Sequence, residues 1–256
     1  LHSAHVRDPE AILNHAGYYG QAVKEISTSL STLIVPIFLH FISPKWTLVI
    51  GSAMFTFYFA SFFFINNCLF FFANIFLGVA SALTFTSFYS CQMIFSTKET
   101  LARNSVRIQG IASLSLITGG LLYIYITKTH ADPSVTHYRY YSESETRTMC
   151  IFLLAFCIAN LLLTCGLPTR EIDNSVSSEN FQSKMGSLHL LKVTVSTLID
   201  YRILLFVPRF INHGLLISFF MNVYPTSLQY SGIIAKQYPM ITAYYAFAMC
   251  AGTTFC

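Results

Sequence analysis

Charged residues are scarce in this chain: Asp, Glu, Lys and Arg together make up 10% of its 256 residues. A typical soluble domain is about 25% charged. Apolar residues instead reach 54% of the chain, with 24 Phe and 15 Tyr among the aromatics. Because so much exposed aromatic surface would aggregate in water, the composition excludes an ordinary soluble domain and favours surfaces that face lipid.

The sequence motifs of enzymes are also absent. There is no glycine-rich phosphate loop, no H-E-x-x-H and no nucleophile elbow, so we expect no enzymatic activity. The seven cysteines form no C-x-x-C pair, which favours small buried side chains over metal ligands. We expect no cofactor and no metal. The net charge of +4 is dispersed, without a basic run, and this argues against nucleic-acid binding.

Long apolar runs are what the sequence has in place of charge. Residues 17–127 form four such runs, broken only at 43–46, 66–68 and 96–104. Roughly 20 apolar residues cross a bilayer as a helix, and breaks this short leave only an up-and-down arrangement. We therefore predict an all-α membrane protein with about seven transmembrane helices. The expected spans are 18–42, 47–65, 69–95, 105–127, 149–166, 203–224 and 240–256.

Lys and Arg are unevenly divided between the loops on the two sides of these spans. The tendency of positive charge to remain inside assigns the richer set, which includes 43–46, 96–104 and 167–202, to the cytosol. The last of these loops contains an apolar pattern at helical spacing, which predicts an amphipathic helix on the inner membrane surface. A plain extension of the next span is the other interpretation. The pattern comprises Leu188, Leu191, Val195, Leu198 and Ile199.

Polar side chains inside the spans mark the candidate sites, because a charge inside a bilayer is costly unless it faces a cavity or a partner. In the first span, Gln21, Glu25 and Thr28 recur at helical spacing and form one polar stripe. One interpretation is a cavity lining in which Glu25 binds an ion or a proton. The other is a stripe that packs on a further helix. Lys24 beside it is expected to extend outward.

A second cluster lies in the sixth span, where Arg209, Asn212 and His213 share one helical face. Pro208 beside them is expected to kink this helix. One interpretation is a buried cluster that binds an anionic group. The alternative is that Arg209 extends to the inner surface while the others pack in the ordinary way.

The turn before the fourth span carries a further candidate, Arg103. Its spacing from Glu99 allows an intrahelical ion pair, whereas a role in coupling different parts of the protein is the other interpretation. Small residues also recur four apart within the third and fourth spans, which is typical of close helix contacts in membranes. These pairs are Gly78 with Ala82, and Ser115 with Gly119.

Several short segments, taken in order, resemble one known family. The chain is similar to the ion channel regulatory protein family, the UNC-93-like branch of the major facilitator superfamily, over about residues 14–127 and again over 202–227. The places of this family's Trp and Gln-Gly-like stretch hold other residues here, at 85–89, and Lys24-Glu25 stands where the family is usually apolar. The similar segments are 17–22 (GYYGQA), 44–52 (PKWTLVIGS), 77–82 (LGVASA), 99–105 (ETLARNS) and 223–227 (VYPTS), with Gly214 and Phe219.

The resemblance implies a twelve-helix, two-lobed protein of which this chain holds helices two to eight. Residues 1–166 would be most of the N-terminal lobe without its first helix, 167–201 a cytosolic loop between the lobes, and 202–256 the start of the C-terminal lobe. Since the chain begins with Leu and remains apolar to its last residue, we expect it to be a fragment.

Two functions follow as hypotheses. The first is a multi-pass membrane protein, in the plasma membrane rather than an internal one, that modulates the activity or trafficking of a membrane partner such as a potassium channel. The second is a secondary transporter that moves a small solute by alternating access. Membrane lipids are expected partners in both cases. The sequence does not identify the substrate or the partner.

Overall fold

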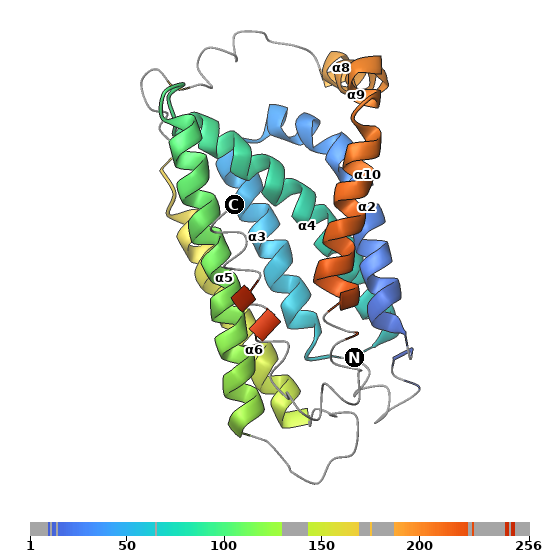
Figure 1. Ribbon diagram of the computed structural model, residues 1–256, viewed down its shortest axis with the longest axis vertical. Helices are drawn as coiled ribbons and strands as arrows, with labels where there is room; N and C mark the ends of the chain where they lie inside the picture. The colour runs from blue at the N-terminus through green and yellow to red at the C-terminus, as the bar shows by residue number, and fades with distance from the viewer. Residues whose placement is uncertain are drawn as a thin grey trace. The chain divides into compact units, whose positions relative to one another are not determined.

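The computed structural model describes residues 10, 12–13, 15–64, 66–129, 143–168, 175, 187–224, 227, 244–245 and 247–248. Every regular element among these residues is a helix, which confirms the all-α prediction (Figure 1). The elements are α2 (Ala16–Phe41), α3 (Pro44–Ser61), α4 (Asn67–Ile94), α5 (Leu101–Thr129), α6 (Glu143–Cys165), α8 (Ser187–Ile199), α9 (Tyr201–Leu204), α10 (Val207–Ser218) and the π-helical turn η1 (Phe219–Val223).

The chain divides into two compact units. The first comprises Leu1–Leu101 and Tyr141–Thr197 and contains α2, α3, α4, α6 and most of α8 (Ser187–Ile199). The second comprises Ala102–Tyr140 and Leu198–Cys256 and contains nearly all of α5 with α9, α10 and η1. The division into lobes that the sequence suggests, at 166 and 201, stays a prediction.

The first three helices follow one another through short turns, as the breaks in the apolar runs predict. α3 begins at Pro44, where the missing N–H of proline costs nothing because the first turn of a helix leaves it unpaired. Asn66 begins α4, since its side-chain oxygen accepts a hydrogen bond of 2.8 Å from the backbone N–H of Cys68. These local signals fix where each apolar run starts its helix.

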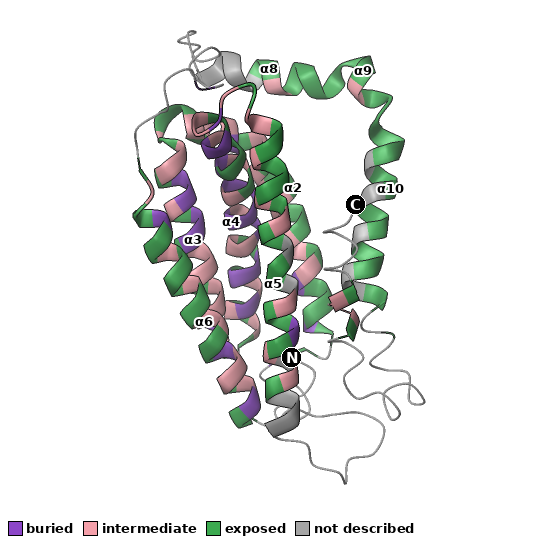
Figure 2. Ribbon diagram, turned by 60° about the vertical axis from the view of Figure 1, so that its left-hand side comes forward, coloured by how far each residue is buried: buried purple, intermediate pink, exposed green. Residues whose placement is uncertain are grey.

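α4 is the central helix of the first unit. It packs against both α2 and α3, and α6 packs on the far side of α3. Figure 2 shows buried residues along much of α4, whereas α6 is mostly exposed. Two small apolar clusters stabilise the contact of α4 with α2. One contains Ile12, Ala16 and Phe70, and the other contains Val35, Ala82 and Leu83.

Glycines allow the helix backbones to approach closely where α2 crosses α4 and where α3 crosses α4. A Cβ atom built on Gly78 of α4 would lie 2.5 Å from the carbonyl oxygen of Lys24 on α2. A Cβ atom on Gly51 of α3 would overlap with the Oγ1 atom of Thr84 on α4. Gly78 accepts no side chain without movement of a helix, because the atom in the way belongs to the backbone of α2, whereas a side chain at Gly51 would have to displace the hydroxyl group of Thr84. Both glycines allow close packing on α4.

One of the two small-residue pairs predicted from the sequence is confirmed. Gly78 contacts α2, and Ala82, one turn further along, is buried against Val35 of α2. The other pair, Ser115 and Gly119, is exposed on α5, and a Cβ atom on Gly119 would meet nothing within 4 Å. Within the described residues this second pair therefore marks no helix contact.

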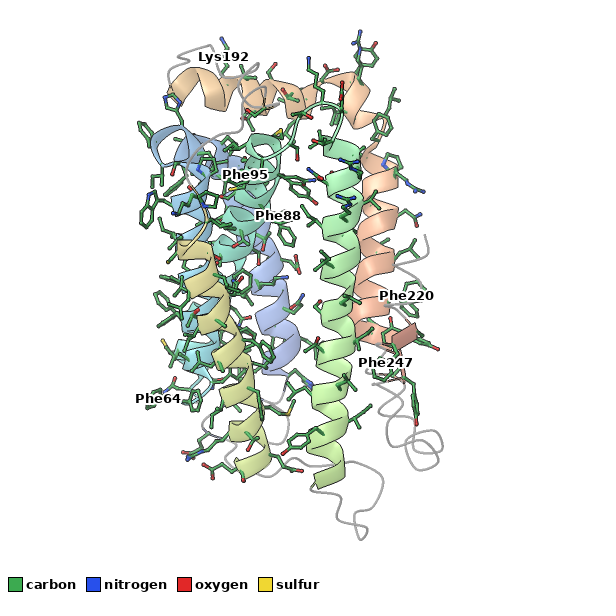
Figure 3. All side chains as sticks on the ribbon, turned by 90° about the vertical axis from the view of Figure 1, so that its left-hand side faces the viewer. Phe64, Phe88, Phe95, Lys192, Phe220 and Phe247 are labelled. Atoms are coloured by element: carbon green, nitrogen blue, oxygen red, sulfur yellow. The ribbon has the colours of Figure 1, made fainter. Side chains whose placement is uncertain are left out.

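Four helices are long and apolar enough to cross a membrane: α2, α4, the segment Leu101–Leu122 of α5, and α6. They correspond to the expected spans 18–42, 69–95, 105–127 and 149–166. In Figure 3, Phe64 and Phe95 lie near opposite ends of α4. The expected span 47–65 forms α3, which is shorter, ends at Ser61 and is not among the four.

The expected span 203–224 is interrupted. α9 ends at Leu204 and α10 begins at Val207, with Pro208 in its first turn. Proline has no N–H to donate to the carbonyl group four residues earlier, so the helix stops before it and restarts around it. The kink expected at Pro208 is therefore a helix start. Of the expected span 240–256, only 244–245 and 247–248 lie within the described residues.

The helix expected in the loop after α6 is present as α8. Its described apolar side chains, Val195, Leu198 and Ile199, are exposed. The spacing of apolar residues thus predicted the helix correctly, while its location on the inner membrane surface stays a prediction.

Candidate functional site

The polar stripe of the first span lies on α2 and centres on Glu25. Oε1 of Glu25 accepts a hydrogen bond of 2.9 Å from Nε2 of Gln21 and one of 2.7 Å from Nζ of Lys24. The structure therefore brings Gln21 and Glu25 together and adds Lys24, which forms an ion pair with Glu25 where the sequence suggested only an outward extension. The positive charge of the ammonium group offsets that of the carboxylate on the same helix turn.

The hydroxyl groups of the stripe are occupied within α2 itself. Oγ1 of Thr28 donates to the carbonyl oxygen of Lys24 at 2.8 Å, and Oγ of Ser29 donates to that of Glu25 at 2.9 Å. Thr32 repeats the pattern with the carbonyl oxygen of Thr28, at 2.8 Å. Because these donors already have acceptors, the carboxylate of Glu25 is the group of the stripe best able to bind something else.

The network lies beside the contact of α2 with α4. Ser27 donates from Oγ to the carbonyl oxygen of Ile75 at 2.9 Å, and the backbone of Lys24 faces Gly78. At about 3.6 residues per turn, Ser27 lies on the face that meets α4, whereas Glu25 lies well to one side of it. The side chain of Glu25 is 56% exposed and that of Lys24 22% exposed. The stripe thus flanks a tightly packed helix crossing.

The second candidate cluster is on α10, in the second unit. Arg209 and Asn212 share a helical face, as their spacing predicts, and both are exposed. The side chain of His213 lies outside the described residues. No hydrogen bond joins Arg209 to Asn212 in the described part of the chain, so the structure does not assemble a buried anion site from these two.

Arg103 lies in the first turn of α5 and is exposed, as is Glu99 in the turn before it. Both interpretations of Arg103, as an ion-pair partner and as a coupling residue, stay predictions. Across the described ranges, no three His, Cys, Asp or Glu side chains come close enough together to hold a metal ion. The site with the most developed geometry is therefore the one around Glu25.

A comparison with protein families relates this geometry to function. The model of the family described as ion channel regulatory protein UNC-93 matches residues 8–256. The chain belongs to this family. The match extends the resemblance seen in short segments to nearly the whole chain, including the stretch 128–200. No solved structure matches the chain.

Membership of the UNC-93 family and the four candidate spans together make the chain an integral membrane protein of an ion channel regulatory family. Glu25 and its partners consequently lie on a membrane-spanning helix. In that setting an ionisable side chain is costly unless it is paired, and such residues usually have a functional role.

One polar contact between helices was missed by the sequence analysis. Nδ2 of Asn160 on α6 donates to Oγ of Ser52 on α3 at 3.3 Å. Asn160 is the one amide side chain in the apolar span 149–166, and this isolation could have indicated a partner on another helix. On α4, the hydroxyl groups of Thr84 and Ser87 are buried without a hydrogen-bond partner in the described residues.

The π-helical turn was also missed. Within it, the N–H of Tyr224 bonds to the carbonyl oxygen of Phe219, five residues earlier. The same register would pair the carbonyl oxygen of Phe220 with residue 225, which is proline and has no N–H. The hydroxyl group of Tyr245 donates to this carbonyl oxygen. The sequence signal was Pro225, because it leaves one acceptor in the preceding turn without a backbone donor.

Proposed function

We propose that this chain regulates a potassium channel by associating with it in the plasma membrane, and that it tunes the activity or trafficking of that channel. The observation that carries the proposal is the match of the UNC-93 family over residues 8–256. The proposal assigns the chain no catalytic activity and no cofactor. Its action consists of binding, through helices that pack against a membrane partner.

The geometry around Glu25 supports a binding role over ion transport. Ionisable residues on ion or proton pathways in membranes face the bundle interior or a water-filled cavity. Glu25 instead shares Oε1 with Lys24 and Gln21, and its side chain is more than half exposed. The second oxygen of the carboxylate is left for a donor on another helix, and polar contacts of that kind join helices in membranes.

We further propose that the chain has the arrangement of the major facilitator superfamily, as helices two to eight of twelve. The succession of α2, α3 and α4 through short turns supports this assignment, as does the close packing of α4 between α2 and α3. On this arrangement, 1–166 would belong to one lobe and 202–256 to the other.

Co-expression with a panel of potassium channels tests the proposed function. We expect the chain to change the current or the surface abundance of at least one channel, with no solute uptake of its own. Recording current and surface abundance in the same cells separates an effect on activity from one on trafficking. Unchanged values across the panel would contradict the proposal.

The alternative is a secondary transporter of a small solute, which is favoured by the presence of a carboxylate within an apolar span. On that account, Glu25→Gln should abolish uptake while the protein still reaches the membrane. A proton-coupled flux into vesicles that contain only the purified chain would establish transport as the primary function. The regulator account predicts no such flux.

A further inference from the structure

The flank of α2 that carries Glu25 is open in the described structure. The neighbouring face of α2 is fixed in place. There the backbone of Lys24 packs against Gly78, and the hydroxyl group of Ser27 donates to the carbonyl oxygen of Ile75. The helix therefore cannot rotate to bury Glu25 against α4 without losing these contacts. The carboxylate remains on a surface that α3, α4 and α6 do not cover.

The carboxylate of Glu25 is only half satisfied, because its ion pair with Lys24 uses one of its two oxygen atoms. Glu25 lies nine residues after the start of α2 at Ala16, which is roughly 13 Å along the helix axis at about 1.5 Å per residue. On a span that enters the bilayer at Ala16, this depth would lie within the hydrocarbon core, which offers no hydrogen-bond donor. Lys24 and Gln21 use Oε1 only, and no donor in the described part of the chain reaches Oε2.

The charge on this surface specifies the chemistry of the partner. The ammonium group of Lys24 is mostly covered, whereas the carboxylate of Glu25 is the more exposed member of the pair. The flank as a whole has no net charge, but the group that it presents most openly to a neighbour is a carboxylate. A basic side chain on a second helix complements it, because such a side chain can donate to Oε2 and bring its charge beside the carboxylate.

We propose that the Glu25 flank, made up of Gln21, Lys24 and Glu25, is the docking surface for a transmembrane helix that carries one Lys or Arg at the same depth. This inference rests on the proposed function, since the helix would be supplied by the regulated channel. It adds the surface and the chemical class of the partner. A lipid headgroup is a poor occupant, because the carboxylate lies below the headgroups and repels anionic ones.

Model transmembrane peptides test this directly. The full chain is reconstituted in phosphatidylcholine vesicles with one of three Leu/Ala peptides of about 20 residues, whose central residue is Arg, Leu or Glu. Trp46 is the single tryptophan of the chain and lies at the start of α3, near the end of α2. Energy transfer from Trp46 to a dansyl group on the peptide then reports binding. We expect the Arg peptide to bind at least about threefold more tightly than the Leu peptide.

Three variants make the test specific. Glu25→Gln leaves the ammonium group of Lys24 unpaired and should therefore lose the preference for Arg. Glu99→Gln, a matched change at an exposed carboxylate outside the spans, should keep that preference. The double variant Lys24→Glu with Glu25→Lys keeps the ion pair but reverses the exposed charge, so its preference should move to the Glu peptide.

Equal binding of the three peptides by the unmodified chain would overturn the proposal, and that is also the result expected if the chain's own helices cover Glu25. A preference for Arg that persists in Glu25→Gln would overturn it too. If the peptide preferences hold while no channel current changes, the docking surface stands and the potassium-channel function fails. The two proposals are thus separable.

Discussion

The carbonyl oxygen of Lys24 on α2 lies so close to Gly78 on α4 that a Cβ atom there would come within 2.5 Å of it. The same Cβ atom would also lie 2.5 Å from Cβ of Ser27. A backbone carbonyl cannot move aside as the end of a flexible side chain can. The crossing that fixes the position of Glu25 therefore depends on the absence of a side chain at residue 78.

Gly78→Ala should accordingly destabilise the first unit, by roughly 1 to 3 kcal/mol if α2 has to shift, as is common for overpacked cores. Gly119→Ala is the matched control, because a Cβ atom there meets nothing within 4 Å, and alanine favours a helix over glycine. Thermal unfolding in detergent, followed by circular dichroism, measures both variants. Equal unfolding temperatures for the two would show that the close contact at Gly78 is not required.

Two buried serines should respond in opposite ways to the loss of their hydroxyl groups. Oγ of Ser52 accepts the hydrogen bond from Asn160, whereas Oγ of Ser87 has no partner in the described residues. Ser52→Ala should cost about 1 kcal/mol, and Ser87→Ala should be neutral or stabilising because an unsatisfied polar group is removed. Denaturation of the two variants in the same detergent gives the comparison. A clear loss of stability in Ser87→Ala would indicate that its hydroxyl group has a partner in solution.

The contact of Tyr245 with the π-helical turn makes a prediction for the second unit. Tyr245→Phe leaves the carbonyl oxygen of Phe220 without the donor that Pro225 cannot provide, so we expect a loss of about 1 kcal/mol. Tyr244→Phe is the adjacent control, since the Tyr244 side chain is 55% exposed. Amide hydrogen exchange measured over 219–224 should increase in the first variant only. Equal exchange in both variants would contradict the role given to Tyr245.

The sequence predicted the helices well because their signals are local. The apolar runs predicted starts at 47 and 69 for the helices that begin at Pro44 and Asn67, two or three residues earlier, where Pro44 and the side chain of Asn66 suit a helix start. The interruption before Val207 could also have been predicted from Pro208, but the apolar run around it suggested one continuous span. Where proline removes a backbone donor, a helix can be interrupted even within an apolar run long enough to predict one continuous helix.

The candidate site was predicted less completely, for a physical reason. Helical spacing placed Gln21, Glu25 and Thr28 on one stripe, but it could not show which groups would be satisfied inside the helix. Thr28 bonds to its own backbone, and Lys24 is the ion-pair partner of Glu25 although it is the adjacent residue. Side-chain conformation, which a periodicity does not contain, determines these pairings.

The central claim is that the chain acts by regulating a potassium channel, and one recording tests it most directly. Potassium current per channel at the cell surface is measured with the unmodified chain, with Glu25→Gln and with Glu99→Gln. The account predicts that the unmodified chain and Glu99→Gln change this current or the number of channels at the surface, and that Glu25→Gln does so much less. Two results together would contradict the account. The potassium current and the number of channels at the surface would be the same with and without the unmodified chain, and the purified chain would carry a solute flux.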